Sequence, residues 1–133
     1  MKLSSKTHYG LMACYILGKN DRKPISASEL ESKISVSGKY LEKIMRMLSN
    51  HGIVSASRGA NGGYYLAKDT ENITIGDIVR TLEDNMEIIE CVSKDGSCKC
   101  CPSSVVWKKL YNGINDLLDS ITLKQLLDGE VKL

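Results

Sequence analysis

The sequence has no long hydrophobic run, no targeting segment and no nucleotide-binding loop. Its longest unbroken apolar run, residues 11–17, has seven residues, whereas a membrane-spanning helix needs about 20. Its first residues do not combine a charged region, an apolar region and a small-residue cleavage site, so no secretion signal is expected. No Gly-x-Gly-x-x-Gly or Walker-type motif occurs. We therefore expect a cytoplasmic chain without a membrane partner, built as one small domain with or without an appendage.

Cysteines are few, and their distribution argues against a disulfide framework. Four of the five lie within eleven residues, namely Cys91, Cys98, Cys100 and Cys101. A disulfide framework spreads its cysteines to join distant segments, so a cluster favours metal ligation or thiol redox chemistry. Cys14 stands apart on the apolar face of a predicted helix, where we expect it to be a small buried hydrophobic residue.

The net charge of +2 hides a division between the two halves of the chain. Residues 1–68 contain eleven Lys and Arg against four Asp and Glu, a net charge of +7, and residues 69–133 carry −5. A basic half joined to an acidic half is typical of a polyanion-binding module attached to another element. An unevenly charged solvated surface explains the same numbers equally well.

The first half of the chain has the order of elements of a winged helix-turn-helix. Helical periodicity covers residues 5–18, 26–33 and 39–50, with Ser26 and Glu29 at capping-box spacing. Two short strand-like runs, residues 53–57 and 64–67, follow around a glycine-rich loop that contains Arg58. In such a fold the helix before the hairpin enters the major groove of DNA.

The second half predicts three more helices and a dimer seam. Thr74 and Thr122 are expected to cap helices over residues 74–82 and 122–127, and a long helix is expected over residues 102–120. Apolar residues of the long helix step by 3, 4, 3 and 4, as in a coiled coil; they are Trp107, Leu110, Ile114, Leu117 and Ile121.

The predicted fold is therefore mainly α with a small β-hairpin wing: a winged helix-turn-helix followed by a long C-terminal dimerisation helix. Residues 1–68 would form the DNA-binding domain. Residues 69–101 would form a linking helix and a cysteine-containing sensing loop, and residues 102–133 the dimerisation helix and a last short helix.

Several of these residues carry a resemblance to a known family. They are Met1, Lys2, Leu3, Ser4, Ser5 and Lys6 at the start, Tyr40, Leu41 and Glu42 in the third helix, Arg58, Gly59, Gly62, Gly63 and Tyr64 in the hairpin, and Trp107, Ile121, Thr122 and Leu123 near the end. The sequence resembles the IscR-like family of winged-helix transcriptional regulators, which includes relatives of IscR, NsrR and CymR. The resemblance implies a homodimeric repressor, not an enzyme, that binds a near-palindromic operator in double-stranded DNA.

The same resemblance implies an iron–sulfur cluster, of the 2Fe-2S or 4Fe-4S type, in the cysteine loop. Cys91, Cys98 and Cys101 align with the three cysteine ligands of cluster-bearing members. Ser104 stands where IscR has a histidine ligand, so the fourth position is open. His8 of the partner chain is one candidate, since NsrR uses a partner aspartate there; Cys100 and a non-protein ligand are the others.

Three other readings of the cysteine loop stay open. Zinc is one, although paired C-x₂₋₄-C knuckles are missing. A thiol/disulfide switch without metal is the second. A thiol oxidoreductase is the third and most distant, because Cys98-x-x-Cys101 precedes a helix but no βαβ sheet is predicted.

The resemblance also suggests which residues meet DNA, although a charged helix face is often only solvated. The candidates are Lys6, Lys39, Tyr40, Glu42, Lys43, Arg46, Arg58, Gly62 and Gly63. A carboxylate on a DNA-facing helix, such as Glu42, is most useful as an acceptor from cytosine N4. Arg58 is suited to the minor groove or to phosphate. The two glycines are expected to serve turn geometry.

Overall fold

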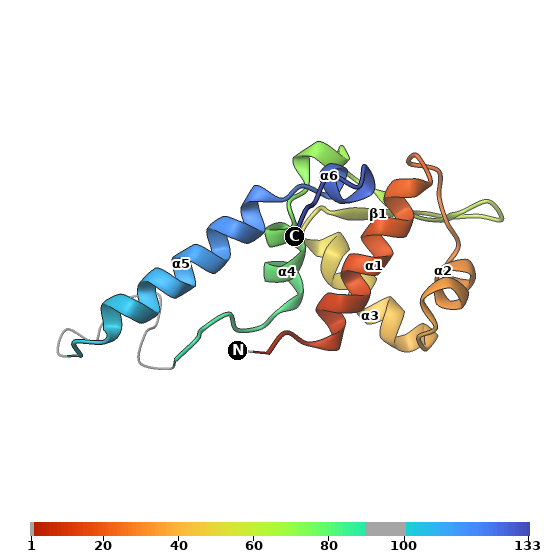
Figure 1. The fold of residues 1–133 in the computed structure, drawn as a ribbon. Coiled ribbons are helices and arrows are strands. Elements are labelled where there is room, and N and C mark those ends of the chain that lie inside the picture. Colours follow the sequence, from red (N-terminus) through yellow and green to blue (C-terminus); the bar gives the residue numbers. More distant parts are fainter. Residues whose placement is uncertain (1, 90–100) are drawn as a thin grey trace.

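The computed structural model describes residues 2–89 and 101–133, and these contain six α-helices, one short 3₁₀ helix and one hairpin (Figure 1). In chain order they are α1 (Ser5–Lys19), α2 (Ala27–Ile34), α3 (Gly38–Asn50), β1 (Val54–Ser57), β2 (Gly63–Leu66), η1 (Thr70–Asn72), α4 (Ile75–Leu82), α5 (Ser104–Ser120) and α6 (Leu123–Leu127). The predicted mainly helical fold with a hairpin wing is confirmed.

Helix boundaries follow side-chain caps. Ser26 and Ser37 accept hydrogen bonds from the backbone N–H groups of Glu29 and Tyr40, and so begin α2 and α3. Only half of the predicted capping box at Ser26 forms, and the carboxylate of Glu29 lies 3.5 Å from the ammonium of Lys33 on the next turn. Full capping boxes begin the two later helices, at Thr74 for α4 and at Thr122 for α6.

The hairpin is tied to the helical body through its second strand. β1 and β2 pair antiparallel, with Val54 opposite Leu66 and Ser57 opposite Gly63. Ile25 exchanges two backbone hydrogen bonds with Tyr64, of 2.9 and 2.8 Å. A Cβ atom on Gly63 would collide with the backbone of Ile25, so only glycine allows this close approach. The wing base is therefore held rigidly beside the helices.

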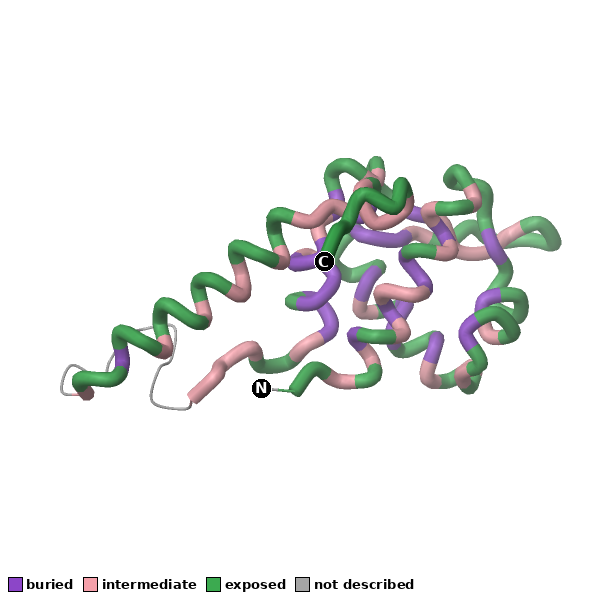
Figure 2. The backbone as a smooth tube through the Cα atoms, in the orientation of Figure 1, coloured by how far each residue is buried: buried purple, intermediate pink, exposed green. Residues whose placement is uncertain are grey.

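One hydrophobic core lies between the helices and the hairpin, and most of its residues come from α1, α3, α4 and the hairpin (Figure 2). It contains Ala13, Cys14, Leu17, Ile25, Leu30, Ile34, Leu41, Ile44, Met45, Leu48, Ile53, Val54, Leu66, Ile73, Ile78, Leu82 and Leu123. Cys14 is fully buried, as predicted, and burial raises the pKa of its thiol to about 12. Because α4 and α6 contribute to this core, residues on both sides of position 68 pack together, and the functional boundary expected there stays a prediction.

Helix α5 projects away from this body (Figure 1). Its C-terminal end returns to the body through backbone hydrogen bonds of 2.8 Å, from Ile75 to Ile121 and from Leu123 to Ile73. Arg80 of α4 binds Asn115 and Asp119 on the near side of α5. The contacts of Arg80 therefore hold α5 in a fixed orientation relative to α4. No helix within residues 2–89 and 101–133 is both long and apolar enough to cross a membrane.

The close crossing of α1 and α4 at Gly10 gives the first prediction. A Cβ atom at Gly10 would overlap the side chain of Leu82, which is fully buried in the core. Gly10→Val should therefore lower the free energy of unfolding by about 1–3 kcal/mol, the usual cost of overpacking a core. Gly10→Ala should cost less, because alanine regains about 1 kcal/mol of helix propensity. Urea unfolding measures both, and equal stability of Gly10→Val and wild type would contradict the crossing.

Candidate DNA interface and its link to the cysteine segment

Helix α3 has one buried side and one charged side. Its buried residues are Leu41, Ile44, Met45 and Leu48. Its exposed charged residues are Lys39, Glu42, Lys43 and Arg46. Because the buried side is anchored in the core, the charged side is presented to solvent as a fixed surface. Exposed charged side chains on one face of an anchored helix are the chemistry that a helix needs to contact DNA in the major groove.

Glu42 and Arg46 form an ion pair on this surface. Arg46 Nη2 lies 2.9 Å from Glu42 Oε1, at i and i+4 spacing. Both side chains are more than half exposed, so the pair contributes under about 1 kcal/mol and can open at low cost. In the free protein Glu42 therefore shields the charge of Arg46.

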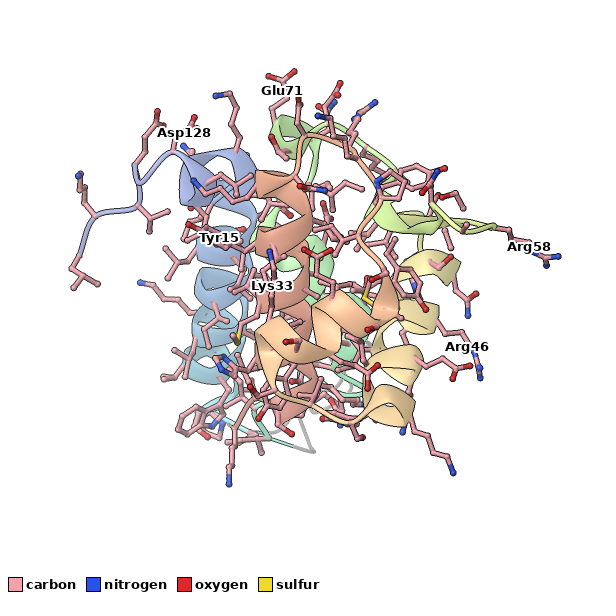
Figure 3. All side chains as sticks on the ribbon, turned by 90° about the vertical axis from the view of Figure 1, so that its right-hand side faces the viewer. Tyr15, Lys33, Arg46, Arg58, Glu71 and Asp128 are labelled. Carbon is pink, nitrogen blue, oxygen red and sulfur yellow. The ribbon has the colours of Figure 1, made fainter. Side chains whose placement is uncertain are left out.

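The wing carries Arg58 to its tip. Arg58 is exposed, and Figure 3 shows that it and Arg46 project from the same side of the molecule. The loop turns sharply because Gly59 has a positive φ of 103° and its carbonyl accepts a 3.0 Å hydrogen bond from Gly62 N–H. Gly62 and Gly63 each approach neighbouring backbone too closely for a side chain, which agrees with the expected role in turn geometry.

Two other candidate DNA residues make contacts within the protein. The hydroxyl of Tyr40 lies 3.0 Å from Ser5 Oγ, and its ring packs edge-on against Tyr9 with centroids 6.0 Å apart. The side chain of Lys6 is 15% exposed, and its ammonium lies 3.6 Å from Asp84. Direct contact of Tyr40 and Lys6 with DNA stays a prediction.

Sequence reasoning missed Glu83, which joins the end of α4 to the start of α1. Its Oε1 accepts hydrogen bonds from Ser4 N–H (2.6 Å), Ser4 Oγ (3.0 Å) and Thr7 Oγ1 (2.5 Å). Partial burial would raise the pKa of the Glu83 carboxyl, but these hydrogen bonds and the charge of Lys6 outweigh it, so the pKa lies below its ordinary value. In the sequence Glu83 is one of two adjacent acidic residues, and nothing near it in the chain predicts that it contacts Ser4 and Thr7.

Most of the predicted cluster ligands lie outside the described residues, namely Cys91, Cys98 and Cys100. Cys101 is half-buried just before α5, and its Sγ lies 3.0 Å from Ser103 Oγ. His8 is exposed near the start of α1, with its ring 5.3 Å from that of Tyr9. Within residues 2–89 and 101–133 no three His, Cys, Asp or Glu side chains gather as a metal site would require. The ligand set therefore stays a prediction.

The residues of the predicted dimer seam differ in how far they are exposed. Leu110 and Leu117 are 46% and 62% exposed, whereas Trp107, Ile114 and Ile121 are half-buried. Val105 and Val106, which the seam did not include, are also exposed. The exposed apolar surface, here called the α5 stripe, consists of Val105, Val106, Leu110, Gly113, Ile114 and Leu117.

The hairpin, the anchored α3 and the charged face define a winged-helix transcriptional regulator. Residues 3–129 match the Rrf2 family, which is described as an iron-dependent transcriptional regulator. The chain belongs to this family, and the resemblance inferred from the sequence is confirmed.

Individual relatives agree with this assignment. The chain is similar to the HTH-type transcriptional regulator IscR of Sodalis glossinidius, with 30% identity over 98% of this chain and 81% of that protein. It is similar to the solved structure of T. potens IscR, with a TM-score of 0.80 and 32% identity over 98% of this chain and 89% of that one. CymR, the global cysteine regulator of B. subtilis, gives a TM-score of 0.81 and 33% identity over 96% and 97% of the two chains. Because the relatives are transcriptional regulators, the family implies DNA-binding regulation and not catalysis.

The charged face of α3 predicts different effects for its lysines and for Glu42. Lys43→Ala should weaken binding to every duplex and reduce the slope of log affinity against log salt by roughly one, the loss of one phosphate contact. Glu42→Ala should relax base preference at one position per half-site and strengthen non-specific binding, because it releases Arg46. Titrations of labelled operator variants at several salt concentrations measure both effects.

Lys124→Ala is the matched control, because Lys124 is an exposed residue of α6 and its removal takes one positive charge from a helix other than α3. A salt slope that changes equally in Lys124→Ala and Lys43→Ala would mean that net charge, and not α3, is responsible. If Glu42→Ala lowers the affinity for all operator variants by the same factor, Glu42 does not recognise a base.

Proposed function

We propose that this regulator is a homodimeric repressor of a near-palindromic operator, and that a cluster or thiol state in residues 91–101 controls its affinity. The observation that carries DNA recognition is the common direction of Arg46 on α3 and Arg58 on the wing (Figure 3). A recognition helix in the major groove with an arginine reaching the adjacent minor groove uses both surfaces at once.

The α5 stripe supports a second copy of this chain as the partner. Val106, Leu110 and Leu117 are each about half exposed or more, and they follow one another along a single face of a helix that projects from the body. A monomer rarely leaves such a continuous apolar surface in water. A two-fold dimer along α5 would place two recognition helices about one turn of DNA, or a multiple, apart.

Charge placed in the α5 stripe should separate the subunits. Leu110→Glu combined with Leu117→Glu buries two carboxylates in the proposed interface, so analytical ultracentrifugation should show monomers, and operator binding should become far weaker. Asn112→Glu is the control, because Asn112 is an exposed α5 residue outside the stripe. An unchanged dimer in the double variant would show that the stripe serves another purpose.

Residues Cys91, Cys98 and Cys101 are the proposed ligands of an iron–sulfur cluster. Thiolates are the ligands that these clusters prefer, and the family description as iron-dependent favours iron over other metals. The cluster would supply sensitivity to redox state or iron supply. His8 of the partner subunit is proposed as the fourth ligand because His8 is exposed at the start of α1, and Cys100 is the alternative.

A cluster-free switch is the second candidate, and the likeness to CymR favours it. CymR is a cysteine regulator by name, and its structure matches this chain about as well as that of IscR. In this alternative the clustered thiols form a disulfide on oxidation or bind zinc. A thiol oxidoreductase has no support from the relatives.

Anaerobic purification separates these candidates. The wild type should be brown with visible charge-transfer bands, and Cys91→Ala, Cys98→Ala and Cys101→Ala should each lose them. Cys14→Ala should keep these bands, because Cys14 is fully buried in the core and is not one of the proposed ligands. His8→Ala should shift the spectrum and the reduction potential while iron stays partly bound. Colourless protein without iron would favour the thiol or zinc switch.

A second comparison identifies the fourth ligand. If His8→Ala leaves the visible spectrum unchanged and Cys100→Ala alters it, the fourth ligand lies within the loop. That result would contradict a ligand from the partner subunit.

A further inference from the structure

The first turn of α1, residues 4–7, touches both the segment that follows α4 and the recognition helix. On one side Glu83 accepts three hydrogen bonds from Ser4 and Thr7. Thr7 is buried, so this junction is partly shielded from water and its charge-assisted hydrogen bonds are strong. Asp84 adds a second link through Lys6, whose ammonium lies 3.6 Å away.

The same turn holds the start of α3. Ser5 Oγ lies 3.0 Å from Tyr40 Oη, and Tyr40 belongs to the first turn of α3, beside Lys39 and two residues before Glu42. Tyr9, one helical turn after Ser5, supports the Tyr40 ring edge-on. A shift of the first turn of α1 would therefore displace the start of α3, which is the part of the helix that is expected to contact DNA bases.

The first turn of α1 depends on Glu83 for its own order. Ser4 is the N-cap residue, but its side chain makes no capping hydrogen bond to α1. The carboxylate of Glu83 instead places a negative charge at this end of the helix, where the helix dipole favours it. Removing Glu83 should loosen this turn before it affects the fully buried core.

We propose that the first turn of α1 positions the recognition helix in response to the segment after α4, with Glu83 and Tyr40 as the positioning residues at its two junctions. The physical route is short: Glu83 holds Ser4 and Thr7, and the neighbouring Ser5 holds Tyr40. This inference rests on the proposed function only in taking residues 91–101 as the sensor. In that case a change in the sensor would shift Glu83 and Asp84 and so weaken or strengthen their contacts with Ser4, Thr7 and Lys6.

Hydrogen exchange on metal-free protein without DNA tests the route directly. Glu83→Ala should speed exchange of amides in the first two turns of α1 and at the start of α3 by at least about tenfold, the low end of the factor expected for lost hydrogen bonds to a charged group. In the Tyr40→Phe background the same change should still loosen α1 but should no longer reach α3. Ser5→Ala, a milder change, should uncouple α3 in the same way.

Glu87→Ala is the matched control, because Glu87 lies in the same segment but its carboxylate binds only the nearby Asn85 at 3.3 Å among the described contacts. The proposal is overturned if Glu83→Ala leaves α3 exchange as slow as Glu87→Ala does. It is also overturned if the effect on α3 persists without the Tyr40 hydroxyl. If Glu83→Ala fails to fold, Glu83→Gln, which keeps an acceptor but removes the charge, takes its place with a smaller expected increase.

Operator binding then separates this inference from the proposed function. If wild-type affinity is the same with and without iron or oxidant, the proposed control by residues 91–101 is wrong, whatever the exchange result. If wild type responds and Tyr40→Phe responds equally at unchanged thermal stability, the proposed function stands and the route through Tyr40 is wrong. A response reduced several-fold in both Glu83→Gln and Tyr40→Phe supports the inference.

Discussion

Burial of the apolar side of α3 is the constraint on which the rest of the structure depends. Leu41, Ile44 and Leu48 are essentially inaccessible to water, and each contributes roughly 1.5–3 kcal/mol on the usual scale for buried aliphatic side chains. This burial fixes the rotation of α3 about its axis, so its charged residues cannot turn inward. The wing is fixed in turn, because β1 follows α3 directly and β2 is tied to Ile25.

The second constraint is the attachment of α5 to α4. Arg80 binds Asn115 and Asp119, and the backbone bonds of Ile73 and Ile75 hold the chain on either side of Thr122. α4 also packs against α1 and supplies Ile78 and Leu82 to the shared core. A helix that carries the α5 stripe is therefore rigidly linked to the body that carries α3, so the geometry of a dimer would set the distance between two recognition helices.

Local features of this fold were predictable from the sequence because they depend on residues close together in the chain. The helices over residues 5–18 and 39–50, the hairpin and the caps at Thr74 and Thr122 were all predicted from periodicity and capping residues. The Glu42–Arg46 ion pair was also within reach, since i and i+4 spacing of opposite charges gives it directly.

Long-range contacts were not predictable in this way. Glu83 meets Ser4 across 79 positions of sequence, and Tyr40 meets Ser5 across 35. Nothing in residue spacing marks such partners, and a polar side chain near a helix end is usually only solvated. The resemblance suggested Lys6 as a DNA contact, but not that its ammonium lies beside Asp84, where α1 and the end of α4 meet.

The central claim is that α3 and the wing of two subunits bind one DNA duplex together. Hydroxyl-radical footprinting of an operator tests it most directly, with wild type and Arg58→Ala side by side. The account predicts two protected regions related by a dyad and spaced by about one helical turn or a multiple, with minor-groove protection beside each that is lost in Arg58→Ala. A single protected region without a dyad, or a footprint that Arg58→Ala leaves unchanged, would contradict it.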